Sequence, residues 1–199
     1  MIEYALLENI NLTGQFLIAM PSMTDPYFSK TLTFICTHNQ DGAMGVVINR
    51  PIELNVASLF KQMQLEIQAP ITALLQAPLY FGGPVQQERG FILHTPHQEY
   101  NSTLIVNNSI ALTTSKDILE AAAKLDAPEK MLIALGYAGW TAGQLEDEMG
   151  KNAWLNFETQ QLNELHALIF DAQNQDKFDL AMNMMGLNFA NLSDVAGHA

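Results

Sequence analysis

Cys36 and His38 are the residues whose types and spacing could most directly do chemistry. Cys36 is the one cysteine of the chain, and it precedes His38 by two positions in a run rich in β-branched and aromatic residues. Side chains two apart on a strand share one face. A thiol beside an imidazole can have a lowered pKa and act as a nucleophile or redox sensor. The alternative, which we favour, is a cysteine that only packs in the core.

Histidines are the other candidates for polar chemistry. His94 and His97 flank Thr95-Pro96, a bend that could bring their imidazoles together. The sequence contains no C-x-x-C, H-x-x-x-H or H-E-x-x-H pairing, which are the spacings typical of metal sites. We therefore expect hydrogen-bonded histidines, no metal site and no cofactor.

Two glycine-rich segments follow predicted strands. They are Gly82-Gly-Pro84 and Gly136-Tyr137-Ala-Gly-Trp140. Such glycines can expose backbone amides to an anion, and aromatic residues beside them can line a pocket. The alternative, which we favour for Gly82 and Gly83, is that glycine lets two backbones pass closely. The G-x-G-x-x-G, Walker and G-x-S-x-G patterns are absent from the sequence, so no nucleotide-binding or hydrolase signature supports catalysis.

The charge balance limits the partners that this chain can have. It contains 9 Lys and Arg against 21 Asp and Glu, a formal net charge of −12 at pH 7. Such a chain repels the phosphate backbone of a nucleic acid, so direct nucleic-acid binding is disfavoured.

Three features of the sequence bear on its location. A single cysteine agrees with a reducing compartment, the N-terminus lacks the basic start of a signal peptide, and no apolar run is long enough to span a membrane. We therefore expect a cytoplasmic protein without membrane contact.

Hydrophobic alternation and turn residues outline the elements that position these side chains. We expect an N-terminal arm over residues 1–13, with a short helix over 4–8, and one domain over 14–199. Strands are predicted over 15–20, 31–38, 43–49, 79–81, 89–95, 103–106, 110–113, 131–137 and 152–157, and helices over 55–63, 115–125, 141–149 and 177–187, with a helical or mixed segment over 160–170. Hairpins dominate the middle of the chain, which predicts an α+β fold with a mixed, mainly antiparallel sheet.

The predicted helix over residues 141–149 has the clearest start signal. Thr141 and Gln144 have the spacing of a capping box, and Trp140 can pack onto Leu145. The acidic run Glu146-Asp-Glu148 lies in the early turns, where the helix dipole favours anions. Adjacent helical positions point in different directions, so we interpret this run as a solvated face rather than an acid/base pair.

A series of short motifs runs in order along nearly the whole chain. They are Phe16-Leu-Ile-Ala-Met-Pro21, Asp25-Pro26, Gly42-Ala-Met-Gly45, Asn49-Arg-Pro51, Gly82-Gly-Pro-Val85, Arg89-Gly-Phe-Ile-Leu-His94, Thr114-Ser115 with Asp117, Ala134-Leu-Gly-Tyr-Ala138 with Trp140, Gly143-Gln-Leu-Glu146, Asn152-Ala-Trp154 and Val195-Ala-Gly-His-Ala199. From about Gly14 to Ala199 the chain thereby resembles the YqgE/AlgH family. The resemblance implies a bacterial cytoplasmic protein, with a sheet partly curled into a barrel and surrounded by helices. It implies no established activity and no catalytic residues, although some members are described as regulators of exopolysaccharide gene expression.

Three hypotheses about function follow. The first is a non-enzymatic regulatory protein that binds a small molecule or a protein partner where the 36–49 hairpin and the two glycine segments meet. Its candidate residues are Cys36, His38, Asn39, Asn49, Gly82, Gly83, His94, Tyr137 and Trp140. The second is a redox sensor or enzyme that uses the Cys36 thiol. The third is a transcriptional regulator that acts directly on DNA, which the net charge of −12 disfavours.

Overall fold

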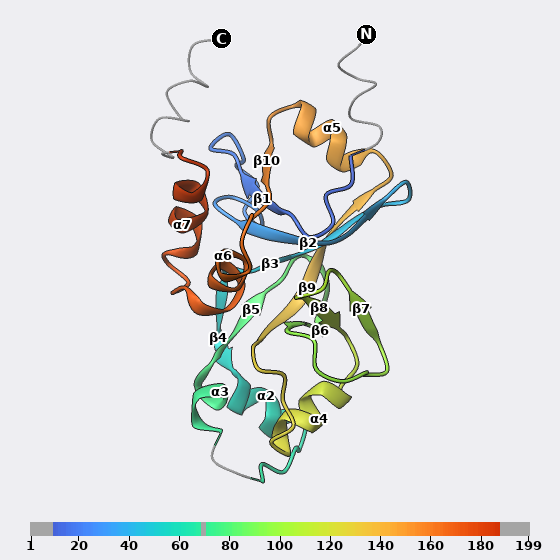
Figure 1. The fold of residues 1–199 in the computed structure, drawn as a ribbon, viewed down its shortest axis with the longest axis vertical. Coiled ribbons are helices and arrows are strands. Elements are labelled where there is room, and N and C mark those ends of the chain that lie inside the picture. The colour runs from blue at the N-terminus through green and yellow to red at the C-terminus, as the bar shows by residue number, and fades with distance from the viewer. Residues whose placement is uncertain (1–9, 69–70, 188–199) are drawn as a thin grey trace.

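A curved sheet of ten strands organises the molecule (Figure 1). The structure is a computed structural model, and it describes residues 10–68 and 71–187. The strands are β1 (Phe16–Ala19), β2 (Leu32–Asn39), β3 (Gly42–Val47), β4 (Pro51–Asn55), β5 (Pro78–Phe81), β6 (Val85–His94), β7 (Thr103–Ile105), β8 (Ala111–Thr113), β9 (Met131–Thr141) and β10 (Trp154–Phe157). The main path of the sheet runs β10-β1-β2-β3-β9-β6-β8-β7, while β5 joins β4 to β9.

The pairing is antiparallel throughout except between β5 and β9. The sheet forms an antiparallel half-barrel, so the α+β class with a mixed, mainly antiparallel sheet is confirmed. β9 has the central place, because its first half pairs with β5 and β6 and its second half pairs with β3.

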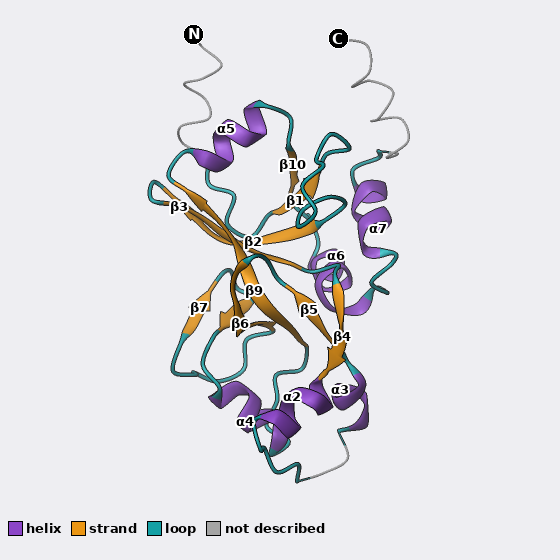
Figure 2. Ribbon diagram, turned by 180° about the vertical axis from the view of Figure 1, so that it is seen from behind, coloured by secondary structure: helices purple, strands orange, loops and turns teal. Residues whose placement is uncertain are grey.

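Helices cover the ends and one side of this sheet. They are α2 (Val56–Gln62), α3 (Thr72–Gln76), α4 (Asp117–Ala123), α5 (Gln144–Gly150), α6 (Leu162–His166) and α7 (Lys177–Met184), and a π-helical turn, η1 (Ala167–Asp171), continues α6. Helices α2, α3 and α4 lie at one end of the molecule and α5 at the other, while α6 and α7 flank the sheet (Figures 1 and 2). None of the helices in the described ranges is long and apolar enough to cross a membrane.

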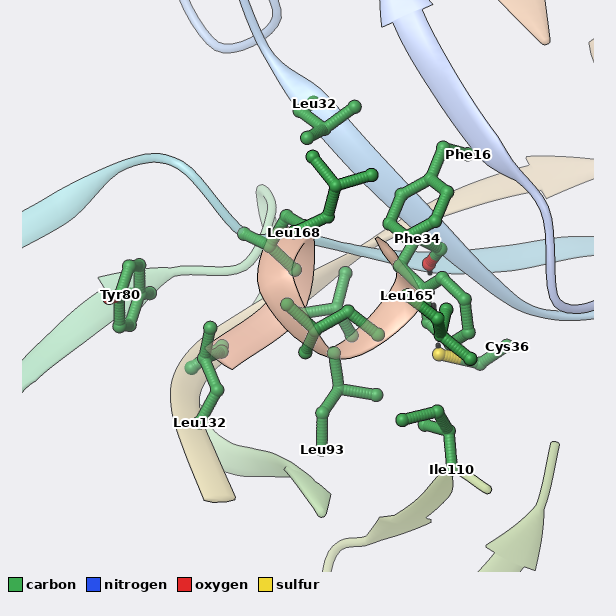
Figure 3. Close-up of a cluster of buried hydrophobic side chains, with 14 of the residues drawn as sticks. Phe16, Leu32, Phe34, Cys36, Tyr80, Leu93, Ile110, Leu132, Leu165 and Leu168 are labelled. Atoms are coloured by element: carbon green, nitrogen blue, oxygen red, sulfur yellow. Dashed lines mark hydrogen bonds between the residues drawn. The ribbon is translucent and has the colours of Figure 1, made fainter. Parts of the chain in front are cut away.

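Three hydrophobic clusters hold these elements together. The first packs α6, η1 and α7 against the sheet around Phe16 and Phe34 (Figure 3). The second packs α2, α3 and α4 on β5, β6 and β9, and includes Phe60 and Ile133. The third lies under α5, on the other face of β1 and β2, and includes Trp154. Each cluster buries apolar surface that one sheet face or one helix stripe cannot bury alone.

Most predicted elements are present, with boundaries that differ by a few residues. The strand predicted over 43–49 ends at Val47, and a further strand that was not predicted, β4, begins at Pro51. A proline is tolerated there because the first residue of an edge strand need not donate to the ladder. The strand predicted over 131–137 continues as β9 to Thr141, so the glycine segment over 136–140 lies within the strand rather than after it. Between the helix predicted over 55–63 and the strand predicted over 79–81, where no element was predicted, the structure has α3.

Of the predicted N-terminal arm, the structure describes residues 10–13. The helix expected over residues 4–8 lies outside the described residues. The division into an arm over 1–13 and a domain over 14–199 stays a prediction. Leu12, at the end of that arm, is 1% exposed and belongs to the cluster under α5.

Candidate functional site

Cys36 and His38 do not share a face of β2. The register shifts between Ile35, which pairs with Gly45, and Thr37, which pairs with Met44, so Cys36 is the extra residue of a β-bulge. A bulge reverses the alternation of side chains along the strand. Cys36 therefore belongs to the cluster on one face of the sheet, while His38 contacts groups on the other. The expectation of a shared face was wrong, because the alternation of residue types does not show the bulge.

The Cys36 thiol is buried among apolar side chains. It is 0% exposed, and its Sγ lies 3.7 Å from the carbonyl oxygen of Phe34 (Figure 3). Burial raises the pKa of the Cys36 thiol far above its ordinary value, because the thiolate would lose its solvation there. The thiol thus stays protonated at neutral pH, which disfavours the nucleophile or sensor hypothesis.

His38 connects the N-terminal segment, β2 and α5. Its Nδ1 accepts a hydrogen bond from the backbone N–H of Leu12 at 3.1 Å. The proton is therefore assigned to Nε2, which donates to Oε1 of Glu146 at 2.8 Å. Its own backbone N–H donates to Oγ1 of Thr13 at 2.9 Å. These contacts give His38 a structural role in the described fold.

The acidic residues of α5 are not simply a solvated face, as was expected. Oε2 of Glu148 accepts the indole N–H groups of Trp140 at 2.9 Å and of Trp154 at 2.7 Å. Oε1 of Glu148 accepts a further hydrogen bond from Gln144 at 2.9 Å. Glu146 binds His38, and only Asp147 is paired at the surface, with Lys151. Trp140 is thus a packing residue of the α5 cluster.

Asn39 and Asn49 also have local structural tasks. Oδ1 of Asn39 accepts from the N–H of Asp41 at 2.8 Å and shapes the β2–β3 turn. Oδ1 of Asn49 accepts from the N–H of Leu32 at 2.8 Å, and its amide donates to the carbonyl of Lys30 at 2.9 Å. Asn49 therefore secures the chain before β2.

The three segments that were expected to surround a ligand do come together. The N–H of Val47 donates to the carbonyl of Gly82 at 2.9 Å, and the N–H of Gly82 donates to the carbonyl of Leu135 at 2.8 Å. A Cβ on Gly82 would lie 2.2 Å from the carbonyl oxygen of Gly136, and one on Gly83 would lie 2.1 Å from the carbonyl carbon of Tyr137. Backbone fills the space between these segments, so the glycines serve close approach rather than a hollow.

His94 belongs to a buried chain of hydrogen bonds that lies apart from the hairpin and the two glycine segments. Its Nδ1 donates to the carbonyl oxygen of Thr95 at 2.8 Å, and its Nε2 lies 2.8 Å from Oγ1 of Thr113, which contacts Oγ1 of Thr103 at 2.7 Å. Burial lowers the pKa of His94, because the imidazolium is poorly solvated there. His97 instead pairs with Asp126 at the surface.

Metal binding finds no support in the described part of the chain. Over residues 10–68 and 71–187, no group of three His, Cys, Asp or Glu side chains is placed to hold a metal ion.

Tyr137, the last of the candidate residues, packs on Phe91 with ring centroids 5.0 Å apart. The residues that the sequence singled out are thus distributed over both faces of the sheet and over separate clusters.

A pocket that the sequence did not predict lies beside β5. It has a volume of about 130 Å³ and is bounded by β5, the start of β9, α2, α3 and η1. Its lining is apolar except for one phenol and backbone groups, and it consists of Val56, Leu74, Ala77, Pro78, Tyr80, Met131, Leu132, Ile133, Ile169 and Phe170. The pocket is thus a small hollow with apolar side chains and exposed backbone polar groups in its wall.

Lys177 lies behind one wall of this pocket and is 0% exposed. Its Nζ donates to the carbonyl oxygens of Ile169 at 2.7 Å and Ile48 at 3.1 Å. The same nitrogen lies 5.1 Å from the centre of the Tyr80 ring. Burial lowers the pKa of Lys177 to about 7, and the nearby Asp171 carboxylate opposes that shift only in part.

Tyr80 and the Lys130–Asp171 ion pair are two further polar features near η1. The Tyr80 hydroxyl donates to Oδ1 of Asn174 at 2.6 Å, and burial raises the pKa of this phenol. Elsewhere on η1, Nζ of Lys130 lies 2.6 Å from Oδ2 of Asp171. These two residues are next in sequence to Met131 and Phe170, which line the pocket. The ion pair therefore joins the start of β9 to the end of η1, a π-helical turn of the kind often found at functional sites.

Sequence reasoning missed Lys177, although one signal was available. In the predicted helix over 177–187, Lys177 is four positions before Ala181, so both occupy the same helix face. Ala181 is buried, and the face that carries it packs in the core. A lysine on an otherwise apolar face is a candidate for a buried charge.

Comparison with known proteins establishes the family. The family model described as AlgH-like matches residues 16–190. A UPF0301 protein of Thiobacillus denitrificans is 51% identical over 193 residues, which cover 97% of this chain and 100% of that protein. A UPF0301 protein of Azoarcus sp. is 49% identical over 189 residues, which cover 95% of this chain and 97% of that protein.

Two solved structures are also similar to this chain. The solution structure of the AlgH protein from Pseudomonas aeruginosa is 44% identical, with a TM-score of 0.75, and covers 96% of this chain and 97% of that one. A crystal structure of a protein from Corynebacterium diphtheriae is 19% identical, with a TM-score of 0.69 over 96% of each chain, a likeness of fold alone. The resemblance noted in the sequence motifs is confirmed, and the chain belongs to the AlgH-like family.

Proposed function

We propose that this chain is a non-enzymatic, cytoplasmic regulatory protein that binds a small molecule with an apolar body in the pocket beside Tyr80. The observation that carries the proposal is the pocket itself, about 130 Å³ in volume and lined almost wholly by apolar side chains. An engineered apolar cavity of about 150 Å³ holds benzene. The pocket is somewhat smaller than that cavity, which limits the apolar body of a ligand to one ring or a short aliphatic chain at most.

The other two hypotheses have less support. A thiol enzyme or sensor needs an accessible thiolate, whereas Cys36 is buried and its pKa is raised. Direct action on DNA needs a basic surface, whereas the chain carries a net charge of −12. A fluorescence anisotropy assay with duplex DNA at low salt tests the latter, and saturable binding there would favour direct action on DNA.

The regulatory role is supported by the contacts of the pocket wall. Ile169 lines the pocket, and its carbonyl oxygen accepts the hydrogen bond from Lys177, the first residue of α7. A ligand that displaces η1 therefore changes the anchorage of α7. Hydrogen exchange of α7 amides, with and without ligand, measures this coupling.

Binding can be tested with benzyl alcohol as the probe. We expect a titration followed by methyl NMR to shift Leu74, Ile133 and Ile169, which line the pocket. Leu74→Trp fills the pocket and abolishes the shifts. Ala73→Trp, at an exposed position of the same helix, is the matched control and leaves them in place.

The outcome that would overturn the proposal is also defined. It is an absence of saturable shifts at these residues up to millimolar probe. If Leu74→Trp instead abolishes capture of a protein partner while benzyl alcohol does not bind, the pocket receives a partner side chain rather than a small molecule.

A further inference from the structure

We propose that a second, polar pocket, between the turn that joins β7 to β8 and the segment that enters α6, binds an uncharged sugar ring. The pocket has a volume of about 240 Å³. One wall is formed by residues 107–109, and the other by residues 159–162 together with Leu165. It shares no lining residue with the pocket beside Tyr80, so this inference goes beyond the proposed function and does not depend on it.

The side chains that line this polar pocket are all uncharged. Four of them are Asn or Gln, two are Ser or Thr, and two are Leu. A carboxamide offers both donors and an acceptor, and a hydroxyl group also donates and accepts. The lining therefore matches a ligand rich in hydroxyl groups, whereas an ionic ligand would find no opposite charge in the walls.

Three carboxamides of the pocket are available to such a ligand. Asn108, Gln160 and Gln161 are exposed, and in the part of the chain that the structure describes their side chains form no hydrogen bond. They lie on both walls, Asn108 on one and the two glutamines on the other. A ring with several hydroxyl groups can therefore bond to both walls at once.

The backbone of both walls is held by other contacts. Oδ1 of Asn107 accepts hydrogen bonds from the N–H groups of Ser109 and Ile110, each at 2.9 Å, which fixes the turn. On the opposite wall, the N–H of Leu165 donates to the carbonyl of Gln161 at 3.2 Å, and Leu165 is 7% exposed in the first hydrophobic cluster. A ligand thus meets walls that are already ordered, which reduces the entropic cost of binding.

Leu162 and the size of the pocket define the ligand further. Leu162 is 54% exposed and lines the pocket, so the C–H face of a sugar ring would cover apolar surface there. The volume is below the range of about 300–1,000 Å³ usual for larger ligands, which indicates one ring rather than an oligosaccharide. Glu158 and Glu164 lie on the same segment and disfavour an acidic sugar.

The experiment compares glucose with glucuronate, which has the same ring and a carboxylate. Titration of the full chain at pH 7 and about 0.15 M salt, which screens long-range repulsion, is followed by NMR of the backbone and side-chain amides. We expect glucose to shift the side-chain amides of Asn108, Gln160 and Gln161 saturably, with a dissociation constant on the order of 1 mM, because no charged group contributes. Glucuronate should bind several-fold more weakly.

A pair of glutamine variants tests the role of the carboxamides. Gln161→Leu should weaken glucose binding about 5-fold, because one hydrogen-bonding side chain is lost. Gln175→Leu, at an exposed glutamine outside the pocket, is the matched control and should leave the affinity unchanged. Unchanged backbone amide shifts away from the substitution show that each variant is folded.

Four results would overturn the inference. They are an absence of saturable shifts at tens of millimolar glucose, equal affinity for glucuronate, equal effects of the two glutamine variants, and tighter binding of N-methylacetamide, which would mean that the pocket recognises peptide groups. Because benzyl alcohol is the probe of the other pocket, its binding without that of glucose would overturn only this inference. Binding of glucose without that of benzyl alcohol would overturn only the proposed function.

Discussion

Trp140 and Trp154 donate their indole N–H groups to the same carboxylate oxygen of Glu148, at 2.9 and 2.7 Å. Their rings meet edge to face with centroids 5.8 Å apart, and they are 7% and 4% exposed. One acidic side chain of α5 thus satisfies two buried donors, one from β9 and one from β10. Buried donors without an acceptor are costly, so this arrangement gives Glu148 a large share in anchoring α5.

Replacing Glu148 tests that anchorage. We expect Glu148→Ala to lower the free energy of unfolding by about 2–4 kcal/mol, because two buried N–H donors lose their acceptor. Glu148→Gln keeps one carbonyl oxygen and should lose less. Urea denaturation followed by tryptophan fluorescence measures both. Asp147→Ala, on the exposed side of the helix, is the control, and an equal loss in that variant would show that the shared carboxylate is unimportant.

Lys177 predicts a characteristic dependence of stability on pH. Its pKa is lowered from 10.5 to about 7 in the fold, so between these values the unfolded chain holds a proton that the folded chain has released. The free energy of unfolding therefore increases with pH across this window. The slope from this group approaches about 1.4 kcal/mol per pH unit.

The comparison with Lys177→Met isolates this contribution, since other titrating groups cancel in the difference. Chemical denaturation at pH 6, 7, 8 and 9 should show the native protein gaining stability relative to the variant from pH 7 to pH 9. Below pH 7 the difference should be constant, because the lysine is then protonated in both states. A difference that does not vary with pH would mean that Lys177 remains charged in the fold.

Substituting alanine at three glycines distinguishes the cost of an unfavourable backbone φ from the cost of a clash between the new Cβ and the neighbouring backbone. Gly136 has φ +74°, and a Cβ there would lie 2.3 Å from the carbonyl oxygen of Gly83. Gly143 has φ +73° with nothing within 4 Å, and Gly150 has open space without a positive φ. We expect Gly136→Ala to cost about 3 kcal/mol or more, Gly143→Ala about 1 kcal/mol, and Gly150→Ala nothing or a slight gain. Thermal and urea unfolding give the order, and similar losses at Gly136 and Gly143 would refute the close backbone approach.

Cys36 should be unreactive in the native protein. Its thiol is buried and protonated, so labelling with a thiol reagent requires the core to open. We expect labelling that is slow at pH 7 and at pH 9, and fast in denaturant. Native-state labelling as fast as that of a free cysteine would revive the hypothesis of a reactive thiol.

The sequence predicts the strands and helices of this molecule well, but it does not predict how the candidate site residues are oriented. The β2–β3 hairpin follows from alternation up to His38 and the turn residues after it, and the structure has both. Local alternation does not show the bulge at Cys36, because a bulge depends on how the strand pairs with β3. This one inserted residue places the Cys36 thiol and the His38 imidazole on opposite faces of the sheet.

The pocket beside β5 and the buried Lys177 could not be predicted from the sequence either, because both depend on contacts between distant parts of the chain. Lys177 hydrogen-bonds to a carbonyl 129 positions away in the chain, and backbone carbonyls have no residue signature. Likewise, Glu148 of α5 was expected to be solvated, because its partners Trp140 and Trp154 are brought to it by the pairing of β9 with β3 and of β10 with β1. Long-range pairing, which local patterns do not encode, decides both sites.

The central place of β9 has a consequence for synthesis of the protein. β3, β5 and β6 all precede it in the chain, yet each needs residues of Met131–Thr141 as a partner. While the ribosome is still making the earlier part, these strands have unpaired edges, which are prone to pair with other chains. We therefore expect the nascent chain to depend on chaperones until Thr141 has emerged, and the two halves of the sheet to close together in a single late step.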